Sequence, residues 1–184
     1  MRLFPEWAPQ RALWTAWPAS SEEWNGDLES PRRDVAALVR ALAPSSRIRV
    51  LVSSSEARQS AASAVGDVSE LVPLAYGDIW RRDTSPLFAT DLNGPCGLRF
   101  RNNGWGGKFL LPGDEAVGDG LAALAGVPTR RFKFVLEGGA IDHDGAGTIL
   151  ATRQTLLNKN RNGWSQAEAE DLLRAALGAR KILW

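Results

Sequence analysis

The chain has a single cysteine, Cys96, and a single histidine, His143, among its 184 residues. One cysteine excludes an internal disulfide and is typical of a reducing compartment or of indifference to redox conditions. No apolar run approaches membrane-spanning length, and residues 1–10 lack the apolar core of a signal peptide. The sequence therefore predicts a cytoplasmic protein.

The chain also lacks an excess of charge of either sign, since it has 22 basic and 21 acidic residues. No basic stripe interleaved with aromatic residues marks a nucleic-acid-binding face, and the arginines lie scattered beside acids. We therefore expect neither nucleic acid nor membrane as a partner.

Tryptophan, in contrast, is abundant, with eight residues. Because a buried indole N–H needs a partner, a tryptophan cluster often lines a site or an interface.

The pattern of apolar residues predicts an α/β fold. One helix is expected to begin at Ser30, with Pro31 in its first turn and Val35, Leu38, Val39 and Leu42 on its apolar face. Further helices are predicted over 55–65 and 114–125 and from 165, where Ser165 and Glu168 have the spacing of a capping box. Strands are predicted over 12–17, 47–52, 68–74, 87–90, 98–101, 131–136, 140–142, 148–152 and 181–184.

Two parts of the chain repeat the order strand–strand–helix–strand, offset by roughly 50 residues. In each part a turn-forming segment, 91–94 or 144–147, joins the first two strands into a hairpin. Such a repeat is typical of units arranged radially or stacked, each of which needs neighbours to close its core. Because two units and an N-terminal piece do not close a ring, we expect residues 1–184 to form a single partial domain.

Two acids, two arginines and two aromatic residues lie within residues 76–86, between two predicted strands. Polar groups at strand ends are partly desolvated, which makes them candidates for a site. Trp80 precedes Asp83 by three residues, and a flat ring beside a carboxylate suits a planar cation such as a guanidinium. The alternative is a salt-bridged loop in which Arg81 and Arg82 neutralise the neighbouring acids.

Glycines accompany polar residues at two further strand ends. Residues 101–108 contain Asn103 and Trp105 with three glycines in four positions, which allow a ligand to approach the backbone closely. The spacing to Lys108 excludes a P-loop, and the alternative is a tight connection before a helix. Glu137 ends a strand ahead of two glycines. It is either an acid of a site or a solvated glutamate in a turn.

Nothing else in the sequence indicates a metal or covalent catalysis. Residues 142–145 have alternating acids before a glycine, but the glutamate that a calcium loop needs at its twelfth position is missing. Hairpin turns favour Asp-Gly in any case, so we predict no metal and no cofactor. His143 is expected to be exposed in the hairpin, and Cys96 to be a small buried residue.

Five motifs in order resemble the agmatine deiminases, the bacterial branch related to the Porphyromonas-type peptidylarginine deiminases. They are residues 14–18, 77–83, 103–108, 137–142 and 156–162. The resemblance covers the whole chain but only about the N-terminal half of such an enzyme. It implies a pentein-type α/β propeller, a pseudo-fivefold ring of strand–strand–helix–strand units, of which about half is present. It also implies hydrolysis of agmatine to N-carbamoylputrescine and ammonia, a step of putrescine biosynthesis.

In the chemistry that this resemblance implies, a cysteine thiolate attacks the guanidinium carbon, two carboxylates clamp its nitrogens and a histidine shuttles protons. By their place in the motifs, Asp83 resembles the guanidinium-binding aspartate and Glu137 an acid bonded to the catalytic histidine. Trp80 resembles a tryptophan that packs against the substrate. Asn103 and Trp105 lie in the family's Gly-rich loop and are assigned to substrate binding.

The sequence departs from the family pattern where the family has its histidine motif and its cysteine loop. Both are absent, and neither Cys96 nor His143 matches them. Smaller departures occur at Arg81, Ser85, Thr155 and Lys159.

These departures lead us to expect that the chain alone is inactive and that a second chain or another copy completes the ring. If the chain ends at Trp184, its open flank should promote self-association. A peptidylarginine deiminase-like enzyme and a non-catalytic guanidinium-binding module remain as alternatives.

Overall fold

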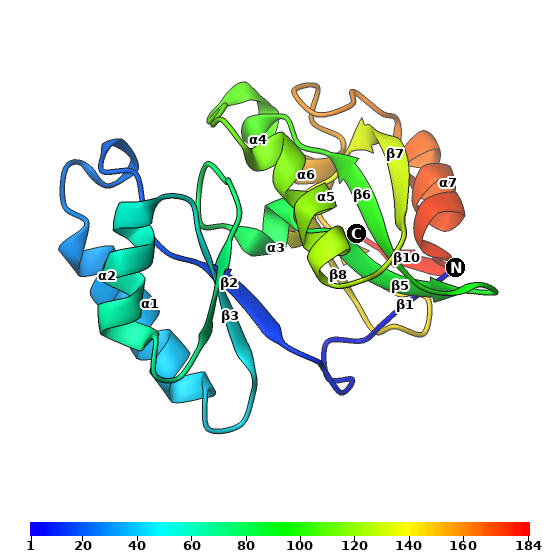
Figure 1. Ribbon diagram of the computed structural model, residues 1–184. Helices are drawn as coiled ribbons and strands as arrows, with labels where there is room; N and C mark the ends of the chain where they lie inside the picture. The colour runs from blue at the N-terminus through cyan, green and yellow to red at the C-terminus, as the bar shows by residue number, and fades with distance from the viewer. The chain divides into compact units, whose positions relative to one another are not determined.

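A computed structural model describes all 184 residues, which divide into two compact units (Figure 1). Unit 1 comprises Met1–Ala8, Arg82–Leu110 and Glu115–Trp184, and unit 2 comprises Pro9–Arg81 and Leu111–Asp114. This division does not test the single partial domain expected over residues 1–184, which stays a prediction. No helix of the structure is both long enough and apolar enough to cross a membrane.

Unit 2 contains a parallel three-stranded sheet in the order β2-β3-β4, which confirms three predicted strands. Its elements are β2 (Leu13–Ala16), η1 (Glu22–Trp24), α1 (Glu29–Leu42), β3 (Ile48–Val52), α2 (Ser55–Val65) and β4 (Glu70–Pro73). The central strand β3 is almost fully buried, and both long helices contribute side chains to the core that it forms. Each helix follows a strand and leads back to the next parallel strand, as parallel pairing requires.

The start and the apolar face of α1 differ from the prediction. The carboxylate of Asp27 accepts hydrogen bonds from the backbone N–H groups of Glu29 and Ser30, at 2.9 and 3.3 Å, so the helix begins before Ser30. Leu38 is 52% exposed, because the buried stripe runs through residues spaced four apart, such as Val35 and Val39. Placing Ser30 at the cap and Leu38 in the core was therefore wrong.

Unit 1 contains both predicted strand–strand–helix–strand repeats. Its strands are β1 (Arg2–Leu3), β5 (Leu87–Asp91), β6 (Gly94–Arg101), β7 (Thr129–Val135), β8 (Ile141–His143), β9 (Thr148–Ala151) and β10 (Lys181–Leu183). They form sheets in the orders β1-β5-β6-β7 and β10-β9-β8. In each repeat an antiparallel hairpin is followed by a parallel strand, reached through α5 (Asp114–Leu124) or α7 (Gln166–Leu177). The capping box of Ser165 and Glu168 at the start of α7 is confirmed.

Besides η1, four short helical segments were not predicted. They are α3 (Arg81–Thr84), α4 (Gly104–Gly107), η2 (Gly138–Ala140) and α6 (Arg153–Leu156). Three or four residues are too few to show a helical period in the sequence. Of these segments, α4, η2 and α6 each follow a strand closely, and α3 lies just before β5. The polar motifs of the sequence lie in or next to them.

Candidate functional site

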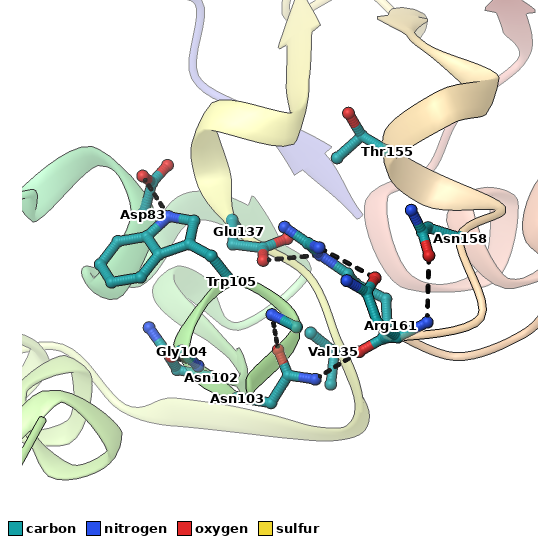
Figure 2. Close-up of polar contacts among 12 residues, drawn as sticks. Asp83, Asn102, Asn103, Gly104, Trp105, Val135, Glu137, Thr155, Asn158 and Arg161 are labelled. Carbon is teal, nitrogen blue, oxygen red and sulfur yellow. Dashed lines mark hydrogen bonds and ion pairs between the residues drawn. The ribbon is translucent and has the colours of Figure 1, made fainter. Parts of the chain in front are cut away.

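Asp83 lies on α3, and both of its carboxylate oxygens accept hydrogen bonds within unit 1, of which Figure 2 shows the one from Trp105. The indole Nε1–H of Trp105 donates to Oδ2 at 3.0 Å, and the backbone N–H of Gly139 donates to Oδ1 at 2.9 Å. Two donors hold the carboxylate in one orientation. The structure thus brings together Asp83 and Trp105, two residues that the sequence assigned to one site.

The two glycines after Glu137 are required by the close approach of α3. A Cβ atom on Gly138 would lie 2.2 Å from the backbone oxygen of Arg82, and one on Gly139 would lie 2.3 Å from Oδ1 of Asp83. The guanidinium of Arg82 also donates to the backbone oxygen of Gly138 at 3.2 Å. The chain around Asp83 is therefore fixed against the segment that begins at Glu137.

The Gly-rich loop forms α4 in a strained conformation. Asn103 accepts a hydrogen bond from the backbone N–H of Gly106 at 2.9 Å, and Trp105 has a left-handed backbone with φ of 55°. This region is costly for a residue with a bulky side chain. Trp105 adopts this conformation here, and its indole is hydrogen-bonded to Asp83. The Nδ2 group of Asn103 donates to the backbone oxygen of Asn160 at 2.8 Å, which ties the loop to a second segment.

Glu137 is only 3% exposed, so the alternative of a solvated glutamate is wrong. Its Oε1 accepts a hydrogen bond from Nε of Arg161 at 3.1 Å. Its Oε2 is buried and has no hydrogen-bond partner. A buried carboxylate oxygen without a donor is costly, and such an atom calls for an explanation such as a ligand.

Residues 160–162 are bonded both to the Gly-rich loop and to the chain at the end of β7, a role that the sequence did not reveal. Asn160 accepts from Asn103, Arg161 bonds Glu137, and Asn162 makes two hydrogen bonds of 2.9 Å with the backbone N–H and oxygen of Val135. The amide of Asn162 thereby continues the pairing of β7 where that strand ends. The sequence shows two asparagines around an arginine in a predicted loop. This pattern indicates that the loop makes side-chain hydrogen bonds but does not identify the residues at the other end.

The salt-bridged loop considered for residues 76–86 is wrong. Within unit 2, the Arg81 guanidinium pairs with Asp114 at 3.3 Å, and both side chains are about 5% exposed. Within unit 1, Arg82 pairs with Glu6 on the surface. Trp80, the remaining residue assigned to the site, belongs to unit 2 and is 54% exposed. Its predicted contact with a substrate stays a prediction.

Cys96 and His143 do not take part in the contacts around Asp83 and Glu137. Cys96 is buried on β6, as predicted, and burial raises the pKa of its thiol. His143 ends β8 and is half-buried rather than exposed. Burial and the nearby Arg82 lower the pKa of its imidazole. No group of three or more His, Cys, Asp or Glu side chains could hold a metal ion.

Chemically, this part of unit 1 is suited to a planar cation. It presents two carboxylates fixed by backbone and side-chain donors, an aromatic ring, and one buried oxygen that still lacks a donor. A guanidinium offers N–H donors in a fixed fork and matches carboxylates in geometry and charge.

Comparisons with known proteins agree in family and fold. The sequence profile described as Porphyromonas-type peptidyl-arginine deiminase matches residues 2–184. Agmatine deiminases of Ectopseudomonas mendocina and Pseudomonas aeruginosa are each 32% identical, over 97% and 100% of this chain but only 51% and 52% of their own length. The chain therefore spans about half the length of these curated relatives.

Solved structures give the same result. The agmatine deiminase of Enterococcus faecalis aligns with a TM-score of 0.92 at 28% identity, over 100% of this chain and 52% of its own. That of C. jejuni with substrate bound aligns with a TM-score of 0.90 at 25% identity, over 100% and 55%. The α/β fold of these proteins is thus present over the whole of this chain.

Proposed function

Because the chain belongs to the Porphyromonas-type peptidyl-arginine deiminase family, we propose that it supplies one part of the active site of an agmatine deiminase. In this proposal Asp83 binds the guanidinium of agmatine, and Glu137 is the acid of the site that bonds a catalytic histidine. The observation that carries it is the buried Oε2 of Glu137, which has no partner and belongs to the residue directly before the short segment that bonds Asp83. Agmatine deiminases recur among the relatives and the solved structures, which supports this substrate.

The reaction would need groups that these 184 residues do not offer. Hydrolysis of a guanidinium through a covalent intermediate requires a thiolate and a general acid or base. Cys96 is buried in the sheet and His143 lies outside the contacts described, so neither is assigned to the reaction. The nucleophile and the proton shuttle would come from residues beyond this sequence, on a longer chain or on a partner that completes a ring of repeats.

Within the proposed site the side chains have distinct roles. Asp83, held by Trp105 and Gly139, would accept hydrogen bonds from one edge of the guanidinium. Glu137 would accept a hydrogen bond from a catalytic histidine of the missing part through Oε2. Trp80 would pack against the substrate, and Asn103 would hold the Gly-rich loop in place.

Two measurements on the 184-residue chain test this function. We expect no ammonia release from agmatine, and we expect agmatine binding by calorimetry that Asp83→Asn abolishes. Asp171→Asn, at an 81% exposed side chain of the same unit, is the matched control. Turnover that depends on Cys96 or His143 would contradict the assignment of the nucleophile. Equal binding by the parent and Asp83→Asn would contradict the clamp.

The same titration separates agmatine from peptidyl-arginine as the substrate class. Agmatine carries a second cationic group, whereas an arginine residue within a peptide carries amide groups at that end. Tighter binding of an N-acetylarginine amide than of agmatine would favour the peptidylarginine alternative and overturn agmatine as the substrate.

A further inference from the structure

A pocket of about 450 Å³ lies within unit 1 and shares no residue with the contacts around Asp83 and Glu137. Three parts of the chain line it: residues 1–3 at β1, the turn and strand ends of the β8–β9 hairpin, and residues 177–180 between α7 and β10. A volume of this size is in the range of pockets that bind small molecules.

Two arginines of the pocket are bonded to the same turn. The Nε–H of Arg2 donates to the backbone oxygen of Gly145 at 3.1 Å, and the NH2 group of Arg180 donates to the backbone oxygen of Ala146. Neither arginine forms an ion pair with a carboxylate. Each of these bonds uses one nitrogen of a guanidinium, so the remaining N–H donors are available to a ligand.

Two glycines with a left-handed backbone bring the lining segments into close contact. A Cβ atom on Gly147 would lie 2.8 Å from Nε of Arg180, and one on Gly178 would lie 2.1 Å from the backbone oxygen of Met1. The Arg180 side chain and the start of β1 therefore pack directly on the backbone that lines the pocket. This packing holds the arginine beside the turn without help from a ligand.

The acids near the pocket are bonded elsewhere. No aspartate or glutamate lines the pocket itself. Asp144, in the same turn, accepts hydrogen bonds from the backbone N–H groups of Ala146 and Thr148 at 2.7 and 2.9 Å, and Glu6 pairs with Arg82. Two guanidinium cations bonded to one turn repel each other, and an anion bound by both would offset this repulsion.

We propose that this pocket binds the phosphate group of a small molecule, and that Arg2 and Arg180 are the residues that bind the phosphate. Two guanidinium cations match a dianion, and each can donate two N–H groups to phosphate oxygens from a planar fork. The pocket has room for more than a phosphate ion, so the expected ligand is a small phosphorylated molecule. The inference does not depend on the proposed function, because the residues involved are different.

The single histidine of the chain gives a specific signal for the test, because His143 lines the pocket. Burial lowers the pKa of its imidazole, so the ring is uncharged at about pH 8. We would titrate inorganic phosphate into the 184-residue chain at this pH and follow the imidazole C–H protons by nuclear magnetic resonance. The signal should shift and saturate in about the millimolar range or below, and sodium chloride at the same ionic strength should not reproduce the shift.

Variants assign the binding to the two arginines. Arg2→Gln and Arg180→Gln should each weaken phosphate binding about tenfold or more, because each removes one of the two cations. Arg180→Lys should keep part of the affinity, since lysine retains the charge but not the planar fork. Lys133→Gln is the matched control, because it removes an exposed positive charge on β7 of the same unit, and it should bind like the parent. Circular dichroism identifies the variants that fold.

Three outcomes would overturn the inference. One is a shift that rises linearly with phosphate or that chloride reproduces. Another is equal phosphate binding by the parent and both arginine-to-glutamine variants, which would place the ion elsewhere. Acetate, a monoanion, should bind more weakly than phosphate, and tighter binding of acetate would refute phosphate as the ligand class. None of these results changes the binding of agmatine expected at Asp83, so the inference and the proposed function fail independently.

Discussion

The two units each contain a buried pair of an arginine and an acid, and the pairs differ in what they leave unsatisfied. In unit 2, Asp114 accepts from the backbone N–H groups of Gly77 and Asp78 as well as from Arg81, so both of its oxygens are used. In unit 1, Glu137 accepts from Arg161 through one oxygen and leaves the other bare.

The unsatisfied atoms of the two pairs have opposite character. In the Arg81–Asp114 pair they are the Nε and NH1 groups of the arginine, whose guanidinium also lies 5.1 Å from the centre of the Tyr76 ring. In the Arg161–Glu137 pair the unsatisfied atom is an acceptor. A buried ion pair alone thus does not mark a site for a cation. A buried carboxylate oxygen without a donor is a candidate for such a site, because it can still accept a hydrogen bond.

Breaking the pair in unit 2 should have the largest effect on stability. Asp114→Ala removes the acceptor for Gly77 and Asp78 and leaves the charge of Arg81 buried without a partner. We expect a loss of about 3–5 kcal/mol in the free energy of unfolding, measured by urea denaturation. The control is Asp119→Ala, whose aspartate pairs with the exposed Arg131 and should cost at most about 1 kcal/mol. Equal losses in both variants would contradict a structural role for the buried pair.

Gly139→Ala should separate binding from stability in unit 1. The new Cβ would lie 2.3 Å from Oδ1 of Asp83, so the carboxylate must move and lose the backbone donor. We expect overpacking to cost about 1–3 kcal/mol and agmatine binding to be lost. Gly126→Ala is the comparison, because a Cβ there meets no atom within 4 Å. Gly126→Ala should cost only the backbone strain of an alanine at a positive φ. Retained agmatine binding by Gly139→Ala would contradict the claim that Asp83 must be held by Gly139.

A smaller, pH-dependent effect should come from Glu23 in unit 2. Burial, followed by the charges of Asp78 and Asp114, raises the pKa of its carboxyl from 4.5 to about 7. A raised pKa means that the folded protein binds this proton more tightly than the unfolded chain does. The contribution to stability is therefore fully present below pH 4.5 and is lost as the pH rises through about 7.

The variant that removes this titration is Glu23→Gln. Urea unfolding at about pH 5 and about pH 9 should show that it gains stability relative to the parent only at the higher pH. A constant difference between the two proteins at both pH values would show that Glu23 does not titrate near neutrality.

The sequence predicted the elements of the fold better than the contacts of the site. Hairpins and long helices follow from local turn chemistry, capping and apolar spacing, so both repeats could be read, as the capping box of Ser165 illustrates. The start of α1 was misplaced because Asp27, three residues before Ser30, accepts the first N–H groups of that helix. Several polar side chains precede this helix, and the sequence alone does not show which of them accepts hydrogen bonds from its first N–H groups.

Of the site, the sequence predicted the residues to which the family resemblance assigned a role, but not the contacts that hold them. Resemblance to the family identified Asp83, Glu137 and Trp105 as candidates, and the structure joins Asp83 to Trp105 directly. Arg161 as the partner of Glu137 could not be predicted, because an arginine in a polar loop has many acids within reach along the chain. Pairing over 24 residues depends on where α4, η2 and the loop after α6 meet in three dimensions.

The central claim is that Asp83 binds the guanidinium of agmatine, and calorimetric titration of agmatine into the parent and Asp83→Asn tests it most directly. Asparagine keeps the size of the side chain but removes the negative charge and replaces one oxygen with a donor. We predict binding by the parent and a loss of about tenfold or more in the variant. Unchanged affinity in Asp83→Asn would contradict the account.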